Sequence, residues 1–493
     1  MRTKQKNSFK HNLCEANMSF DECELAILRH AVDETEKKQG MEKVNNEDVK
    51  KMLVIVEDFL RKKKLICYGG TAINNILPKY AQFYKRDIQI PDYDFFSPNP
   101  IEDAKELADI YYKNGYNDVE AKSGVHFGTF KVFVNFIPIA DITFLHPKIY
   151  NSISRDIIKI NGLRYAPPDF LRMSMYLELS RPDGDVSRWE KILKRLSLLN
   201  KYHPLKTKNC EKVDFEKNSD SPTSKLNTTV RNNLIDQGVV FFGGYSTYLY
   251  SKHMSENEQT QVKKIPDYDV LSEEPKKSAS ILIERLHDDG YKNTKMILHE
   301  EIGEIIPKHY EIKVNNKSIV FIYEPIACHS YNKIKIGDKE VNVATIETIL
   351  SFYLAFVYAN ERHYNRNRLL CISKYLFDVI EKNRLQNKGL LKRFSINCYG
   401  KQQTLEDIRS EKANMFKKFA ESKADVGTKE YQMWFLKYSP HKESKKEGKQ
   451  TKDEDVLEQP KKKTIRKTRR QPQKSNTVAR RTRKMVASNN WLV

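Results

Sequence analysis

Residues 65–76 read LICYGGTAINNI: an apolar run, two glycines and the start of a helix-like stretch. In residues 47–64, EDVKKMLVIVEDFLRKKK, just before the run, apolar side chains recur at helical spacing. Together they predict a helix, a short buried strand, a tight Gly69-Gly70 turn and a second helix. Such a turn lets the backbone approach a phosphate, because glycine has no side chain and the next helix presents free N–H groups. On its own, a glycine pair before a helix is also the pattern of an ordinary turn.

The same pattern occurs a second time in the chain. Residues 228–244, TTVRNNLIDQGVVFFGG, repeat the helix, the apolar run and the glycine pair. Further on, IPDYDFFS at 90–97 is matched by IPDYDVLS at 265–272, and PIAD at 138–141 by PIAC at 325–328. Chance does not place so many landmarks in the same order. The repeat unit is domain-sized, so the chain is predicted to contain a duplicated domain.

Helix-like and strand-like patterns alternate within each copy. This alternation predicts an α/β (α+β) fold in which mixed β-sheets are flanked by helices. Between the copies, residues 206–224 contain KNSDSPTS and are predicted to form a linker. Residues 1–46 are predicted to be a partly helical N-terminal segment, residues 387–440 a C-terminal helical segment, and residues 441–493 a disordered basic tail.

Three acidic residues in the first copy predict a metal centre. Asp92 and Asp94 are two positions apart in a strand-like stretch, so their carboxylates would leave the same face. Adjacent carboxylates repel each other unless a cation lies between them, and such hard ligands suit Mg²⁺ or Mn²⁺. Asp141, in IPIADITF, would complete a site for two ions about 3.5–4 Å apart. Thr71 would donate its hydroxyl to a phosphate oxygen or cap the helix.

Composition limits the class of protein further. Seven scattered cysteines without a C-x-x-C pair argue against a disulfide framework and a zinc site, and favour a reducing compartment. Cys67 and His126 are interpreted as a core residue and a turn residue. The polar first residues and the short apolar runs argue against a secretory signal or a membrane span.

The net charge of +21 is concentrated at one end of the chain. The segment Lys461 to Lys484 contains 12 Lys and Arg and no Asp or Glu. It is too poor in apolar residues to fold alone. The segment is either a solvated tail, a polyanion-binding arm or a nuclear-import signal.

The motifs CYGGTAIN, PDYDFFS and ADITF resemble the DNA polymerase β-like nucleotidyltransferase superfamily. With the duplicated domain, they are more narrowly similar to the poly(A) polymerase catalytic subunits of nucleocytoplasmic large DNA viruses, including poxviruses, African swine fever virus and the giant amoebal viruses. The resemblance extends over about residues 48–438. The separation of Gly70 and Asp92 is longer than in most members of the superfamily.

The resemblance implies a template-independent transfer of AMP from ATP to an RNA 3′ end, with two Mg²⁺ or Mn²⁺ ions as cofactor. Asp92, Asp94 and Asp141 would be the catalytic metal ligands. Gly69, Gly70 and Thr71 would bind the nucleotide phosphates; these six positions are those that match the family motifs. Localisation would be the virion and the host cytoplasm. A homodimer or a viral processivity subunit would be the protein partner, and no membrane is expected.

The two copies differ in the residues that matter for this chemistry. The first, residues 47–205, is predicted to be the catalytic nucleotidyltransferase domain, and the second, residues 225–386, a degenerate one. The second keeps Asp267 and Asp269 but has Tyr245 where the first has Thr71. It is also expected to have Cys328 where the first has Asp141. No motif in the sequence identifies a pocket that selects adenine, so CCA addition, small-molecule nucleotidylation and a non-catalytic RNA-binding scaffold remain alternatives.

Overall fold

The structure is a computed structural model that describes residues 13–14, 17–84, 91, 93–212, 225–262, 268–361 and 363–441. Asp92, Asp267 and the basic segment Lys461 to Lys484 lie outside these residues, as does most of the expected linker. No helix within the described ranges is long and apolar enough to cross a lipid bilayer.

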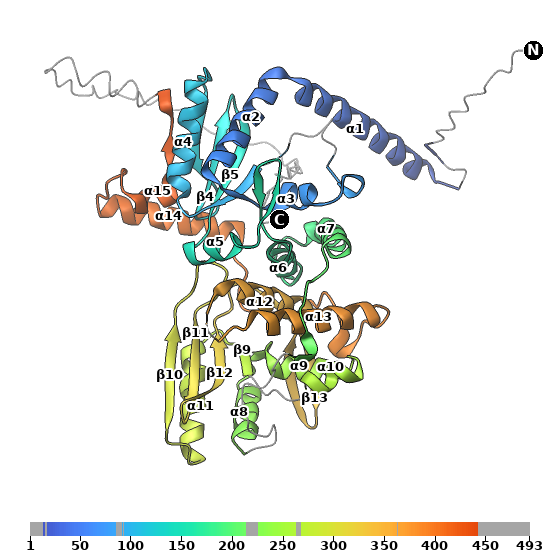
Figure 1. The fold of residues 1–493 in the computed structure, drawn as a ribbon, viewed down its shortest axis with the longest axis vertical. Helices are drawn as coiled ribbons and strands as arrows, with labels where there is room; N and C mark the ends of the chain where they lie inside the picture. The colour runs from blue at the N-terminus through green and yellow to red at the C-terminus, as the bar shows by residue number, and fades with distance from the viewer. Residues whose placement is uncertain are drawn as a thin grey trace, which may run out of the picture.

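Two mixed β-sheets lie one above the other along the long axis of the molecule (Figure 1). The spatial order in the first is β16-β3-β4-β5-β2-β1-β7-β6, and in the second β10-β11-β12-β9-β8-β14-β13-β15. The strands of the first sheet are β1 Ile66–Cys67, β2 Tyr93–Ser97, β3 Val119–Ser123, β4 Thr129–Val134, β5 Ile137–Phe144, β6 Ile158–Ile160, β7 Leu163–Tyr165 and β16 Lys437–Tyr438. Those of the second are β8 Val240–Phe241, β9 Tyr268–Leu271, β10 Thr294–His299, β11 His309–Val314, β12 Lys317–Tyr323, β13 His329–Ile336, β14 Lys339–Ala344 and β15 Cys398–Tyr399.

Helices flank both sheets. The α-helices are α1 Phe20–Asn45, α2 Glu47–Lys63, α3 Gly69–Ile76, α4 Pro100–Lys113, α5 Pro147–Ile153, α6 Pro168–Leu179, α7 Trp189–Tyr202, α8 Lys225–Asp236, α9 Gly244–Ser251, α10 Glu256–Val262, α11 Pro275–Asp288, α12 Ile346–Ala359, α13 Arg366–Lys382, α14 Leu405–Glu421 and α15 Lys429–Phe435. Single 3₁₀ turns are η1 Lys79–Ala81, η2 Val186–Arg188, η3 Cys210–Lys212 and η4 Gly389–Leu391. The predicted α/β class with mixed sheets is therefore confirmed.

The two sheets have the same strand topology. Taken in spatial order, β3, β4, β5, β2, β1, β7 and β6 of the first sheet correspond to β10, β11, β12, β9, β8, β14 and β13 of the second. The parallel and antiparallel pairings also agree strand by strand. We call the elements between residues 47 and 202, together with β16, the first lobe. The elements between 225 and 382, together with β15, are the second lobe.

Helix α12 joins the lobes. Its sequence, IETILSFYLAFVYA, is apolar on every side, and all of its residues are buried. A helix of this composition is stable only where other elements cover it all round. It packs against α6 of the first lobe and α13 of the second, and Figure 1 shows α6 and α12 between the two sheets. The Thr345 side chain caps the helix by accepting a hydrogen bond from the Thr348 N–H.

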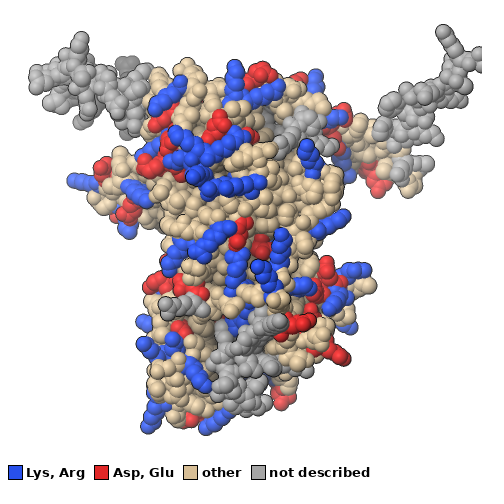
Figure 2. Space-filling model, viewed as in Figure 1, with Lys and Arg blue, Asp and Glu red and all other residues tan. Residues whose placement is uncertain are grey.

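Figure 2 shows basic and acidic side chains interspersed over both lobes on one face. Helix α1 lies apart from the sheets in Figure 1, and the apolar side chains of Phe20, Leu25 and Leu28 on it are exposed.

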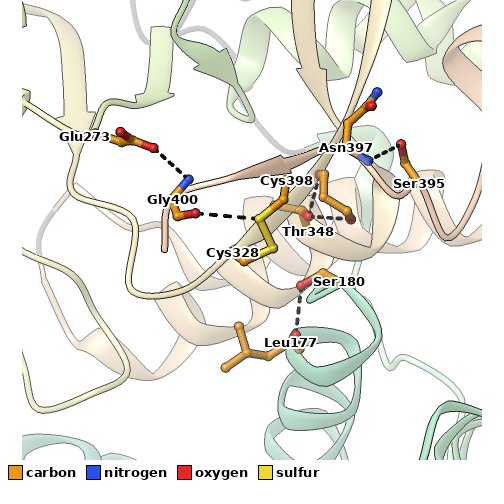
Figure 3. Close-up of a disulfide and its surroundings, with 10 residues drawn as sticks. Leu177, Ser180, Glu273, Cys328, Thr348, Ser395, Asn397, Cys398 and Gly400 are labelled. Atoms are coloured by element: carbon orange, nitrogen blue, oxygen red, sulfur yellow. Dashed lines mark hydrogen bonds between the residues drawn. A yellow bond between two sulfur atoms is a disulfide. The ribbon is translucent and has the colours of Figure 1, made fainter. Parts of the chain in front are cut away.

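Six of the seven cysteines form disulfides, so the expectation that they would not is wrong. The pairs are Cys14–Cys23, Cys210–Cys371 and Cys328–Cys398, the last shown in Figure 3. Two of the pairs join residues 161 and 70 positions apart. The fold brings these cysteines together, so their spacing in the sequence could not reveal the pairing. The expectation of a reducing compartment depended on unpaired cysteines and loses that support.

Candidate active site

The glycine turn of the first lobe is formed by residues that tolerate nothing larger. Gly69 has φ +71°, a left-handed conformation that side chains other than hydrogen disfavour. A Cβ atom at Gly69 would lie 2.6 Å from Oδ2 of Asp94. The backbone N–H of Tyr68 donates to the carbonyl oxygen of Asp94 at 3.0 Å. The turn between β1 and α3 is thus packed directly against the carboxylate.

Two of the three predicted acids are brought together. Asp94 on β2 and Asp141 on β5 are register partners in neighbouring parallel strands, so their side chains leave the same face of the sheet. Asp141 is 9% exposed, and Asp94 is half-buried. Asp92 lies outside the described residues, and its place in the site remains a prediction.

Lys131 is a member of this site that the sequence reasoning missed. It lies on β4 opposite Asp141, and its Nζ atom forms an ion pair with Oδ2 of Asp141. The pair is mostly buried, with 12% of the Asp141 side chain exposed. Lys131 is a charged residue in the otherwise largely apolar strand TFKVFV. This isolated charge is the sequence feature that could have indicated its place in the site.

The donor set fits a divalent metal ion. Asp94 and Asp141 offer carboxylate oxygens from adjacent strands, the ligands that Mg²⁺ and Mn²⁺ prefer. The Lys131 ammonium lies against Asp141, so this position already accommodates a cation. A different group, Asp183, Cys328 and Cys398, is the only set of three close potential ligands found by distance in the part of the chain that the structure describes. Its two sulfurs are joined in a disulfide, so they are not thiolate ligands.

Thr71 and Asn74 in α3 complete the surroundings of the turn. The Thr71 side chain is 3% exposed, and its hydroxyl has no hydrogen-bond partner among the described residues. The Asn74 Oδ1 atom accepts hydrogen bonds from the backbone N–H groups of Phe83 and Tyr84, both at 2.8 Å. Asn74 therefore ties α3 to the segment that leads towards the second predicted motif.

Cys67 and His126 have the roles expected of them. Cys67 is buried in β1, where burial, and then the nearby Asp94 charge, raise the pKa of its thiol. A thiol with a raised pKa is a poor nucleophile. His126 lies in the turn between β3 and β4, and burial followed by the Lys412 charge lowers its pKa to about 4.

The second lobe repeats the turn without the acid pair. A Cβ atom at Gly243 would overlap the carboxylate of Asp269, as the one at Gly69 approaches Asp94. The register partner of Asp269 on β12, however, is Phe321, which is 5% exposed. At the place of Thr71, Tyr245 is buried and packs its ring 5.0 Å from that of Phe241.

The expected correspondence of Cys328 with Asp141 is therefore wrong. PIAD of the first copy lies inside β5, whereas β12 ends at Tyr323 and PIAC follows it. The shared tripeptide occupies different structural positions in the two lobes. On the neighbouring strand, the register partner of Phe321 is Glu311, where the first lobe has Lys131.

Comparisons with known proteins agree with the resemblance seen in the sequence. Residues 54–185 match the family model described as poly(A) polymerase catalytic subunit. A protein of African swine fever virus (strain Badajoz 1971 Vero-adapted), assigned as a poly(A) polymerase catalytic subunit, is 36% identical over 167 residues, which are 33% of this chain and 35% of that protein. A protein of Acanthamoeba polyphaga mimivirus with the same assignment is 32% identical over 176 residues, 35% of this chain and 28% of that protein. The chain thus spans about a third of the length of these curated relatives.

A solved structure has a similar fold over most of the chain. The crystal structure of the Megavirus polyadenylate synthase superposes with a TM-score of 0.71 at 20% sequence identity, over 90% of this chain and 89% of that one. The residues that match the family model include the Gly69 turn and the strands of Asp94 and Asp141. The predicted resemblance is confirmed for residues 54–185, which match the family model of the poly(A) polymerase catalytic subunit.

Proposed function

We propose that this protein is a polynucleotide adenylyltransferase that adds AMP from ATP to RNA 3′ ends without a template. The observation that carries the proposal is the register of Asp94 and Asp141, which places two carboxylates side by side next to the Gly69 turn. The similarity to viral poly(A) polymerase catalytic subunits supports adenine as the base. No residue of the described site selects adenine by itself.

In this reaction the 3′ oxygen of the RNA attacks the α-phosphorus of ATP. A new P–O bond forms, the bond to pyrophosphate breaks, and the 3′-hydroxyl loses its proton. Asp94 and Asp141, with Asp92 as the further predicted ligand, would hold two Mg²⁺ or Mn²⁺ ions. Bound there, the ions would supply activation of the hydroxyl and neutralisation of charge on the leaving pyrophosphate.

The other residues orient the reactants. Gly69 and Gly70 would allow the triphosphate to approach the backbone, and the first N–H groups of α3, which have no acceptor within the helix, would donate to it. The Thr71 hydroxyl is available to donate to a phosphate oxygen. Before substrate arrives, the Lys131 ammonium keeps the Asp141 carboxylate neutralised in its buried position.

The test is incubation of the full chain with an oligoribonucleotide, Mg²⁺ or Mn²⁺ and each nucleoside triphosphate separately, followed by a sizing gel. Long extension with ATP alone is expected. Addition of a few residues, or equal use of all four nucleotides, would favour CCA addition or another nucleotidyl transfer. No extension by a folded, RNA-binding chain would favour the scaffold alternative.

A further inference from the structure

The Cys328–Cys398 disulfide lies where the second lobe meets the first (Figure 3). Cys328 precedes β13 and Cys398 begins β15, so both sulfurs belong to the second lobe. The Asp183 carboxylate comes from the turn that follows α6 in the first lobe. One ligand atom from each of these three residues lies within 4.8 Å of the other two. We call Asp183, Cys328 and Cys398 the interlobe set.

The backbone, and not only the disulfide, holds the two cysteines close together. Strands β13 and β15 are antiparallel neighbours in which Ser330 is the register partner of Cys398. Beyond Cys398, a Cβ atom at Gly400 would lie 2.4 Å from the carbonyl oxygen of Ala327, the residue before Cys328. The chain after β15 is therefore packed against the chain before β13. Since these contacts do not involve sulfur, we expect the two side chains to stay adjacent when the bond between them breaks.

The turn that carries Asp183 is fixed to the same strand. The Gly184 N–H donates to the carbonyl oxygen of Arg181 at 3.0 Å and closes the turn. Between the lobes, the Ser330 N–H in β13 donates to the carbonyl oxygen of Ser180 at 2.8 Å. The end of α6 and the start of β13 are thus joined by a backbone hydrogen bond. This bond holds an exposed carboxylate of the first lobe beside two sulfurs of the second.

Reduction would turn these sulfurs into metal ligands. A dithiol would supply two electrons and two protons: the Cys328–Cys398 bond breaks, two thiols form, and the dithiol becomes a disulfide. The Cys398 sulfur lies 3.6 Å from the carbonyl oxygen of Gly400, an acceptor that a thiol can use and a disulfide sulfur cannot (Figure 3). Two thiolates and a carboxylate are ligands that Zn²⁺ prefers. Its binding would release the two thiol protons to water.

We propose that, after reduction of this disulfide, the interlobe set binds a Zn²⁺ ion, with water in the fourth position. The disulfide joins two parts of the second lobe, whereas the ion would join the second lobe to Asp183 of the first. A change in redox state would thus exchange a bond within one lobe for a metal bridge between both. The interlobe set shares no residue with the candidate active site, so this inference is independent of the proposed function.

The experiment titrates the full chain with Co²⁺, a coloured substitute for Zn²⁺, before and after reduction with a phosphine. The reduced chain is expected to show thiolate-to-cobalt charge-transfer absorption that added Zn²⁺ abolishes. The oxidised chain should not show it. The acids of the candidate active site may take up Co²⁺ in both states, but they have no thiolate and do not contribute to this absorption.

Variants assign the absorption to the interlobe set. Cys398→Ser should abolish it, whereas the control Cys371→Ser, which removes a thiol from a different pair, should keep it. Asp183→Asn should weaken Co²⁺ binding by about tenfold or more, since even residues that only support a metal ligand are worth that much. Its control is Asp185→Asn, which removes the same charge two positions further along the chain and should bind as the wild type does.

Three results would overturn the inference. They are a reduced wild-type chain without thiolate-to-cobalt absorption, unchanged absorption in Cys398→Ser, and a wild-type Co²⁺ affinity in Asp183→Asn. Because Asp183 is exposed, its variant is expected to fold even if Cys398→Ser does not, and circular dichroism checks both. None of these results changes the outcome expected for nucleotide addition.

Discussion

The two lobes share one strand topology and differ in two of the three side chains that lie in a row across it. From β2 to β5 to β4 the first lobe has Asp94, Asp141 and Lys131. From β9 to β12 to β11 the second lobe has Asp269, Phe321 and Glu311. One backbone therefore supports either a pair of acids balanced by a lysine or two separated acids with an aromatic ring between them. The lobes therefore differ at individual strand positions, while the strand topology is the same in both.

The largest expected effect is the loss of nucleotide addition when an acidic residue of the first lobe, and not of the second, is replaced. Asp94→Ala or Asp141→Ala should lower the rate of nucleotide addition by about a thousandfold or more, because each would remove a metal ligand worth several kcal/mol in the transition state. Asp269→Ala is the matched control in the second lobe and should keep nearly the full rate. Rates from single-turnover extension, with circular dichroism as the check on folding, decide this. An equal loss in Asp269→Ala would mean that both lobes are catalytic.

A second prediction tests whether the second lobe can be converted into the first. Phe321→Asp would place a carboxylate between Asp269 and Glu311 at a position that is 5% exposed. An unpaired buried charge of this kind should lower the free energy of unfolding by about 3 kcal/mol or more, without creating activity.

Urea unfolding of Phe321→Asp and of the apolar control Phe321→Leu measures this difference. Nucleotide addition by a chain that combines Phe321→Asp with Asp94→Ala would contradict the prediction. It would show that a single side chain separates the two lobes.

The third prediction concerns the stability of the second lobe at acidic pH. Burial, and then the charge of Arg181, lower the pKa of His329 to about 3, and burial together with His299 and His363 lowers that of His309 to about 4. An unfolded histidine has a pKa near 6.5, so the unfolded chain binds more protons than the folded one below that pH. The stability of the second lobe should therefore be highest above pH 6.5 and fall towards pH 4, by about 3 kcal/mol for His309.

The variant His329→Leu measures the contribution of His329 to this pH dependence of stability. Neither ring nitrogen of His329 has a hydrogen-bond partner among the described residues, so the replacement should cost little at pH 7. Between pH 6.5 and 4, the free energy of unfolding of the variant, measured with denaturant, should then fall less steeply than that of the wild type. An unchanged pH profile would show that His329 is accessible to protons in the folded protein.

The smallest expected effect is at Lys131. Because its ammonium competes with a metal ion for Asp141, Lys131→Met should lower the Mn²⁺ concentration for half-saturation by several-fold, about 1 kcal/mol. Mn²⁺ binding measured by electron paramagnetic resonance reports this directly. Lys122→Met, on the adjacent strand and paired with Glu120, is the control and should bind Mn²⁺ as the wild type does. Weaker binding in Lys131→Met would mean that the lysine positions Asp141 instead.

Local patterns predicted the turn at Gly69 and the strands of Asp94 and Asp141, because each depends on a few adjacent residues. The local patterns could not predict which residues of neighbouring strands are register partners. PIAC resembles PIAD, yet only the pairing of β9 with β12 reveals that Phe321 is the partner of Asp269. Contacts between distant residues were missed for the same reason: Arg195 and the Tyr84 hydroxyl it binds are 111 positions apart.

The last described strand, β16, has a consequence for the order in which the protein is made. It pairs with β3, at the edge of the first sheet, although more than 300 positions separate Lys437 from Lys122. On the ribosome, the first lobe emerges long before the strand that covers this edge. Until then β3 presents unpaired N–H and C=O groups of the kind that recruit strands from other chains. Completion of the first sheet is therefore delayed until Lys437 and Tyr438 have been synthesised, and a chain terminated before them would keep an open edge.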